Sequence, residues 1–255
     1  MDKFIQTITK KAGTAVLKRF GKEGVHYTKS GRLWDVVTRS DLLAEKIIID
    51  AIQKVYPEHG IISEERGRIN DGSEYVWVID PIDGTMNYAF GIGMFGVMVC
   101  LVRRGEVILS VIYLPAMKEM YFAKANKGAY LNGKRIHCLR TKNINKTYGL
   151  GSASMHSRNA RFLKALLKKG EYSRVLFGTY GAMSVNTCFT ACGRRHWFVA
   201  LVGSIWDFAP AYLILKEAGC KVTDTRGRPW KFGQLEMVAA NPALHKQLLK
   251  LTKNV

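Results

Sequence analysis

Apolar side chains recur at helical spacing in the first part of the chain. From residue 2 to about residue 20 they fall three or four positions apart, and Gly21 ends the pattern. A second stretch of this kind runs from about Ser40 to Tyr56 and is closed by Pro57. The pattern therefore predicts two long amphipathic helices ahead of any strand.

From Gly60 the pattern changes to short β-branched and aromatic runs separated by glycine or charged turns. These runs predict strands at 61–62, 75–79, 95–102, 107–113 and 119–123. After about Leu139, strand-like runs alternate with helical stretches. Here we expect strands near 147–151, 174–177 and 197–201, and helices near 157–169, 182–193 and 207–218.

The two textures predict an α+β half over residues 1–139, with a largely antiparallel sheet, and an α/β half over residues 140–255. No internal repeat and no low-complexity linker separates them. We therefore expect the halves to pack tightly enough to count as one domain, with a small-molecule cleft at their junction.

Composition excludes several classes of protein. Of the 255 residues 47% are hydrophobic, enough to bury a sizeable core. No apolar run approaches the roughly 18–20 residues that cross a bilayer, and the first residues lack the apolar segment of a signal peptide, so we expect a cytoplasmic protein. The five cysteines include no Cys-x-x-Cys pair, which favours reduced thiols over disulfides or a zinc knuckle.

The chain is strongly basic. It has 39 Lys and Arg against 20 Asp and Glu, a net charge of +19, and the resulting field attracts anions. Basic residues are spread along the sequence, and no nucleic-acid-binding signature of defined spacing is present. Phosphorylated metabolites, nucleic acid and solubility alone all stay open as explanations.

The segment from Trp77 to Asn87 carries the clearest chemistry. An apolar run ends in Asp80, Pro81 bends the chain, and Asp83 comes three residues after Asp80 and is followed at once by glycine, so both carboxylates are expected in one tight turn. Carboxylates forced together repel and need a cation or a proton. Hard oxygen ligands of this kind suit Mg²⁺, with the Ile82 carbonyl as an extra donor. A solvated Asp-Gly turn is the alternative.

Three further segments extend this site. If a helix begins after Gly84, the amides of Gly84 and Thr85 and the Thr85 hydroxyl form a phosphate-binding helix terminus. Upstream, Glu64 ends a short strand, where it is either a metal ligand or a surface acid. Downstream, Asp207 begins an apolar helix, where it is a ligand, an N-cap or both.

These segments, in this order, resemble the inositol monophosphatase family. The family's central motif, Asp-Pro-Ile-Asp-Gly-Thr-x-Asn, is matched by Asp80 to Asn87, its Glu-Glu pair by Glu64-Glu65, and its Trp-Asp-x-Ala by Trp206 to Ala209. The match continues through Asp35 to Asp41 and through Lys127 to Gly133, so that it covers nearly the whole chain.

The resemblance implies a fold and an activity. It implies an alternating layered αβαβα sandwich, combining α/β and α+β features and often homodimeric. The implied activity is Li⁺-sensitive hydrolysis of phosphate monoesters by a metal-activated water, with two to three Mg²⁺. Its implied metal ligands are Glu64, Asp80 and the Ile82 carbonyl at the first site, and Asp80, Asp83 and Asp207 at the second.

Catalytic and substrate-side roles follow from the same resemblance. Asp41 and Thr85 match the pair that orients the attacking water, and Glu64 also helps a third Mg²⁺. The substrate side is matched only in part; its positions here are Gly84, Thr85, Gly181, Ala182, Met183, Ala200 and Asp207.

Two departures concern the substrate. Ala200 stands where many inositol phosphatases have a glutamate that contacts the sugar-ring hydroxyls, and the family's Gly-x-Ala-Asp appears as Gly193 to His196. Arg194 and Arg195 would favour a bisphosphate or a nucleotide 3′-phosphate, unless they lie on a solvated face.

We therefore expect a phosphomonoesterase for a small phosphorylated metabolite. Inositol monophosphate is the leading substrate, ahead of histidinol phosphate, fructose 1,6-bisphosphate and 3′-phosphoadenosine 5′-phosphate. A protein associated with RNA or transcription, built on a phosphatase scaffold, is the alternative class, and the charge of +19 motivates it. No membrane partner is expected.

Overall fold

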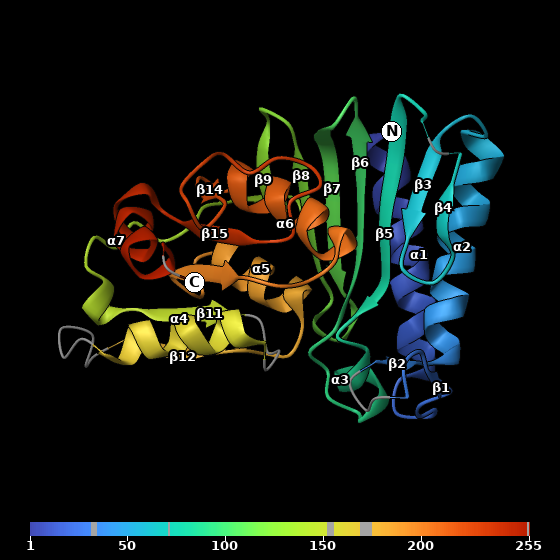
Figure 1. Cartoon of the computed structure of the whole chain (residues 1–255). Helices are drawn as coiled ribbons and strands as arrows, with labels where there is room; N and C mark the ends of the chain where they lie inside the picture. The colour runs from blue at the N-terminus through green and yellow to red at the C-terminus, as the bar shows by residue number, and fades with distance from the viewer. Residues whose placement is uncertain (32–34, 71, 152–155, 169–174, 254) are drawn as a thin grey trace.

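The computed structural model describes residues 1–31, 35–70, 72–151, 156–168, 175–253 and 255. Its layers run across Figure 1 from the two N-terminal helices on the right, through a large sheet, a central helix pair and a small sheet, to two helices on the left. This order is the αβαβα sandwich that the family resemblance implies. No helix in the described ranges is long and apolar enough to cross a membrane.

The larger sheet has eight strands in the order β10-β9-β8-β7-β6-β5-β3-β4. Neighbouring strands are antiparallel except β3 and β5, which are parallel. The bounds are β3 (Gly60–Ser63), β4 (Gly67–Ile69), β5 (Tyr75–Asp83), β6 (Gly96–Arg103), β7 (Glu106–Leu114), β8 (Glu119–Lys124), β9 (Gly128–Leu131) and β10 (Lys134–Ile136). A separate short pair joins β1 (Tyr27–Thr28) to β2 (Val36–Val37).

Helices α1 (Asp2–Arg19) and α2 (Arg39–Val55) cover one face of this sheet. Each buries the apolar stripe that its spacing predicts; in α1 that stripe includes Ile5, Ile8, Ala12 and Val16. These side chains share one core cluster with sheet residues such as Trp77. The first layer of the sandwich is therefore fixed by ordinary amphipathic packing.

The smaller sheet has five strands in the order β12-β11-β13-β15-β14. Strands β12, β11 and β13 are parallel, whereas β15 runs antiparallel to both of its neighbours. The bounds are β11 (Tyr148–Gly151), β12 (Leu176–Gly178), β13 (Trp197–Ala200), β14 (Lys221–Thr223) and β15 (Met237–Ala240).

Helices α5 (Met183–Ala191) and α6 (Ile205–Glu217) lie between the two sheets, and α4 (Ser157–Lys168) and α7 (Pro242–Thr252) cover the outer face of the small sheet. The short elements are α3 (Thr85–Ala89) and the 3-10 turns Pro115–Met117 and Ile144–Lys146. One core cluster runs from Ile62 on the large sheet to Ala239 on the small one. Residues from both sides of the expected boundary at residue 139 therefore share a core.

The structure corrects one local prediction. Strand β5 does not end in a turn at Asp80 but continues to Asp83, with a register shift in its pairing to β6 between these two residues. An irregularity of this kind accommodates Pro81, which has no N–H for the ladder. The sequence patterns did not predict every element. The elements that were missed are β1, β2, β4, β9, β10, β14, β15 and α7. The first residue of the predicted strand 174–177 lies outside the described residues.

Candidate active site

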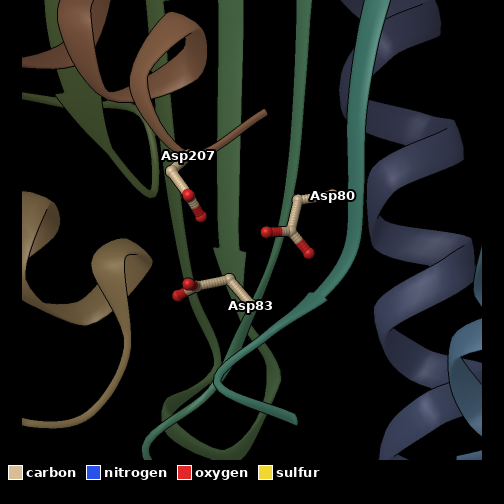
Figure 2. Close-up of side chains that lie close together, drawn as sticks. All are labelled: Asp80, Asp83 and Asp207. Carbon is tan, nitrogen blue, oxygen red and sulfur yellow. The ribbon is translucent and has the colours of Figure 1, made fainter. Parts of the chain in front are cut away.

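Three aspartates meet where the two halves of the chain face each other. Asp80 and Asp83 come from the end of β5, and Asp207 comes from the first turn of α6. One carboxylate oxygen from each lies within 4.8 Å of the others, and Figure 2 shows the three side chains converging on one space. Asp80 is 2% exposed and Asp83 7%. The protein thus concentrates negative charge in a place nearly closed to water.

The electrostatics of this cluster call for a counterion. Burial raises the pKa of Asp80 well above its usual range, and repulsion from Glu64, Asp83 and Asp207 raises it further. Burial, together with repulsion from Asp83, raises the pKa of Asp207 to about 8. The Asp80 Oδ1 atom is buried and has no hydrogen-bond partner among the residues that the structure describes. A buried orphan oxygen among hard carboxylate ligands fits a divalent cation such as Mg²⁺.

Asp83 is held by the N-terminus of α5. Its Oδ1 accepts a hydrogen bond from the Met183 amide (3.0 Å), and its Oδ2 accepts bonds from the Ser184 amide (2.6 Å) and the Ser184 hydroxyl. The helix terminus offers free amides and a positive dipole to this carboxylate. Sequence reasoning missed Ser184, although it lies next to the predicted positions 181–183.

Asp207 and Asp41 occupy the same position in their helices. Each is the third residue of its helix and closes a capping box, Asp41 with Thr38 in α2 and Asp207 with Ser204 in α6. The Ser204 amide donates to Asp207 Oδ2 at 2.6 Å. Asp207 is therefore not the N-cap, and its second oxygen remains available to a ligand.

Asp41 lies beside Thr85. The Thr85 hydroxyl is 3.2 Å from Asp41 Oδ1 and 2.8 Å from the Ile82 carbonyl, while Thr38 occupies Asp41 Oδ2. Burial raises the pKa of Asp41 to about 7, although the Thr38 hydrogen bonds oppose the shift. The structure thus brings together Asp41 and Thr85, which the resemblance pairs in function, and places the Ile82 carbonyl beside them.

Glu64 lies outside the three-aspartate cluster. Its carboxylate pairs with the Lys29 ammonium at 2.9 Å, and the same ammonium reaches Glu65 at 2.7 Å. Burial raises the pKa of Glu64 and Lys29 lowers it, while the charge of Asp83 raises it again. The charge of Asp83 therefore acts on Glu64, and the Lys29 ammonium partly neutralises Glu64. No motif or spacing in the sequence pointed to Lys29.

The loop between β5 and α3 fits closely against the second half. Gly84 has φ 84° and caps α3, and a Cβ there would lie 2.8 Å from the Ala182 Cβ. The Asn87 amide donates to the carbonyls of Met94 and Tyr180, both at 2.7 Å. Gly181, with φ 72°, lies against Asn87. Positions 84, 85 and 181–183 are therefore neighbours in space.

Ala200 and the two arginines have other surroundings. Ala200 lies on β13, fully buried in the core cluster between the sheets, and shows no surface to a substrate. Arg194 makes a two-pronged ion pair with Glu119 at 2.8 and 2.6 Å. Arg195 packs over the Tyr148 ring at 4.4 Å and donates to the Tyr180 hydroxyl. The arginines thus have protein partners.

Two hollows lie away from the aspartates. The larger, about 650 Å³, is lined by residues of α1 and the strands β7 to β9, and the smaller, about 300 Å³, lies beside the start of α7. Neither has any of the three aspartates in its wall. We place the candidate active site at the aspartates because they hold the reactive chemistry, and size alone does not define a site.

Comparisons with known proteins identify the family of this chain. The family model for the inositol monophosphatase family matches residues 1–255. The "Fructose-1,6-bisphosphatase/inositol-1-monophosphatase" of Thermotoga maritima is 30% identical over 97% of this chain and 94% of its own. A "Putative Nus factor SuhB" of Neisseria meningitidis serogroup B is 32% identical over 98% of both chains. The solved structure of a Thermotoga maritima IMPase has a TM-score of 0.88 and 29% identity, covering 100% of this chain and 98% of that one.

The chain belongs to the inositol monophosphatase family. It is a phosphoric monoester hydrolase that acts on small phosphorylated substrates. The family is metal-dependent, in keeping with the acidic cluster.

Proposed function

We propose that the chain hydrolyses a small-molecule phosphate monoester, with inositol monophosphate as the leading substrate, using two to three Mg²⁺ and an activated water. The buried aspartate cluster with its unpartnered Asp80 oxygen carries this proposal. When bound, Mg²⁺ would supply charge stabilisation for the phosphoryl oxygens and lower the pKa of a water.

Each acid has a place in this proposal. Asp80 would be a ligand shared by the two sites, as the family resemblance implies, and its Oδ1, which has no partner among the described residues, is available for this role. Asp83 and Asp207 would complete one site, and Glu64 with the Ile82 carbonyl would complete the other. Lys29 contacts Glu64 through Oε1, so Oε2 is the oxygen that would take this role.

Thr85 and Asp41 would orient the water. A hydroxyl has one proton and can accept two hydrogen bonds. If the Thr85 hydroxyl donates its hydrogen bond to Asp41 Oδ1, at 3.2 Å, its oxygen can accept a hydrogen bond from water and fix the direction of attack. The free amides at the start of α3 would bind the phosphate oxygens.

Metal removal tests the proposal. Treatment with EDTA should abolish phosphate release from inositol monophosphate, and added Mg²⁺ should restore it. Ca²⁺ should inhibit, because it is larger and tolerates poor octahedral geometry. Mg²⁺ should also raise the Tm of the wild type, by mass action, but not that of Asp80→Asn. Full turnover in EDTA would contradict the proposal.

Substrate choice needs a separate measurement. Inositol monophosphate, histidinol phosphate, fructose 1,6-bisphosphate and 3′-phosphoadenosine 5′-phosphate should be compared by kcat/KM in one phosphate-release panel. The printed names of relatives include both inositol-1-monophosphatase and fructose-1,6-bisphosphatase, which supports testing both classes. A preference for the nucleotide would contradict inositol monophosphate as the leading substrate.

A second candidate function is association with RNA or with the transcription machinery. The net charge of +19 and the relatives named Nus factor SuhB favour it. Binding to RNA should weaken steeply with salt, because it releases counterions. Gel-shift titrations with a structured RNA at two ionic strengths test this, and no shift at low salt would contradict RNA binding.

We also propose a homodimer. Three large apolar side chains around α3 are exposed to solvent, namely Met86, Phe90 and Ile92. Apolar patches of this kind mark contact surfaces. Light scattering should give the mass of two chains for the wild type and of one chain for Phe90→Glu. A wild-type monomer would overturn the proposal.

A further inference from the structure

Two cysteines far apart in sequence meet between the two sheets. Cys138 follows β10, and Cys220 lies between α6 and β14. The Cys138 amide donates to the Ala218 carbonyl at 2.9 Å, and the Cys138 Sγ lies 4.0 Å from the position of a Cβ on Gly219, the residue before Cys220. The two thiols therefore lie close enough to shift each other's pKa. Both are nearly buried, at 8% and 6% exposure. The chain thus holds a preformed dithiol that no part of the phosphatase chemistry uses.

The two thiols differ in access. Cys138 forms part of the wall of the 300 Å³ hollow, whereas Cys220 is absent from that wall. A reagent in the hollow therefore reaches Cys138 first, with Cys220 behind it. This is the order that an attacking and a resolving thiol require.

The charges around the hollow favour a thiolate and an anionic reagent. The neighbouring Cys220 thiol, with the Arg140 charge, lowers the pKa of Cys138 although burial opposes the shift. By contrast, burial raises the pKa of Cys100 and of Cys188. Arg140, Lys142 and His137 line the same hollow. The Arg140 and Lys142 side chains are exposed, and no ion pair among the described residues involves either of them.

A metal site does not explain the pair. Within the described ranges, the aspartate cluster is the one group of three or more His, Cys, Asp or Glu side chains close enough to hold an ion. His137 lines the hollow but does not join the thiols in such a group. Two thiols without a third ligand point to sulfur exchange instead.

We propose that Cys138 and Cys220 form a thiol–disulfide exchange site for a small disulfide that carries carboxylates. The Cys138 thiolate attacks one sulfur of the reagent; a mixed disulfide forms and a thiolate leaves. Cys220 then loses its proton to that thiolate and attacks the Cys138 sulfur, releasing a second thiolate, which takes up from water the proton that Cys138 gave up on ionising. Overall the two cysteines are oxidised to one disulfide, and the reagent is reduced to two thiols.

Glutathione disulfide is the probe for this site. The full-length protein is incubated with it, quenched by alkylation and measured by intact mass and peptide mapping. We expect a transient glutathionyl adduct on Cys138, followed by a product lighter than the starting protein by two hydrogens that links Cys138 to Cys220. An adduct that appears first on Cys192, the more exposed cysteine, would overturn the proposal, as would no adduct.

Matched variants separate the two roles. Cys220→Ser, with Cys220→Ala as a second variant in case serine disturbs the core, should stop at the Cys138 adduct. Cys138→Ser should form neither adduct nor disulfide. If Cys138→Ser still reacts at Cys220 at the wild-type rate, the assignment of the attacking thiol is wrong.

The charge argument has its own control. Arg140→Gln should slow the reaction with glutathione disulfide by roughly threefold, in line with one exposed charge contact, and leave the rate with neutral hydroxyethyl disulfide nearly unchanged. Added salt should reduce the difference. Equal slowing of both reagents, or of neither, would overturn the carboxylate-bearing class.

Discussion

The two sides of the acidic centre are built in different ways. On one side, β5 fixes Asp80 and Asp83 in a buried sheet; on the other, α5 and α6 present helix N-termini. The helix side satisfies Asp83 with three hydrogen bonds, whereas Asp80 Oδ1 receives none from the described residues. Two aspartates of one motif thus affect stability in opposite ways. Asp83 stabilises the contact between the halves through hydrogen bonds, whereas Asp80 is a buried carboxylate whose charge needs a bound cation.

Replacing each of these aspartates by asparagine should separate the roles. Both variants should lose phosphatase activity roughly a thousandfold or more, because metal catalysis supplies several kcal/mol. Without metal, Asp80→Asn should raise the free energy of unfolding by about 1–3 kcal/mol, since it removes a buried, repelled charge. Asp83→Asn should lower it by about 1–3 kcal/mol, because one α5 amide then faces an NH₂ group.

Urea denaturation in EDTA measures these stabilities, and phosphate release in Mg²⁺ measures the activities. Asp207→Asn is a third variant for comparison, because Asp207 Oδ2 already accepts a hydrogen bond from the Ser204 amide. Equal destabilisation by Asp80→Asn and Asp83→Asn would contradict the division of roles.

The contact of Gly84 with the second half gives the next test. Gly84→Ala should lower the free energy of unfolding by about 2–5 kcal/mol, from backbone strain at positive φ and from the close contact with Ala182. Gly91→Ala is the matched control, because Gly91 also has positive φ (75°) but nothing within 4 Å of a Cβ. Its cost should be about 1–2 kcal/mol.

Thermal unfolding of the two glycine variants, with phosphate release measured in parallel, separates strain from contact. Gly84→Ala should also lose activity, because it displaces α3 from the α5 loop. The same loss of stability in both variants would mean that this contact contributes nothing.

The sequence predicted the site better on the β5 side than on the helix side. Asp80, Asp83 and Thr85 lie in one short motif, so their proximity follows from chain connectivity. The α5 loop approaches Asp83 from 100 residues away, and nothing in the local pattern around Ser184 indicates that contact. Lys29 was missed for the same reason.

The fold shows the same limit. Helices α1, α2, α4, α5 and α6 and the apolar strands β5 to β8 were predicted to within a few residues, because periodicity records burial. Helix α7 and the buried strand β15 were not predicted. Strands β9, β10 and β14 have three or four residues each, too few to show a period. The irregular end of β5 was predicted as a turn, because a proline such as Pro81 is found both in turns and at bulges of strands.

Burial raises the pKa of an acid and lowers the pKa of a base. His245 on α7 provides the second case. Burial, with the charge of Lys221, lowers the pKa of His245 to about 4. The Thr223 hydroxyl donates to the Asp224 carbonyl at 2.7 Å, so it accepts from His245 Nε2 at 2.8 Å. The folded protein therefore holds a neutral imidazole.

Stability should fall with acidity through this histidine. The unfolded chain binds its proton near pH 6.5 and the folded chain only near pH 4, so the contribution is complete above pH 6.5 and lost as pH falls to 4. The loss is about 3 kcal/mol. The difference in unfolding free energy between wild type and His245→Gln, measured across this range, isolates it. A difference independent of pH would contradict the buried neutral state.

The smallest expected effect concerns Arg194, where sequence and structure suggest different partners. Its two-pronged pair with Glu119 lies over the Phe189 ring. Although burial opposes the shift, the hydrogen bonds from Arg194 and Tyr121 hold the pKa of Glu119 below its usual range. Because the arginine is 41% exposed, Arg194→Gln should cost only about 1 kcal/mol.

Arg194→Lys keeps the charge but loses the fork, so it should recover only part of that stability. Thermal melts at low and high salt measure both variants, and salt should shrink the difference between them and the wild type. A structural pair leaves KM unchanged for mono- and bisphosphate substrates alike, whereas a substrate contact would raise KM for the bisphosphate selectively. A selective rise in Arg194→Gln would mean that Glu119 releases the guanidinium during binding, and would restore the anionic-substrate interpretation of this segment.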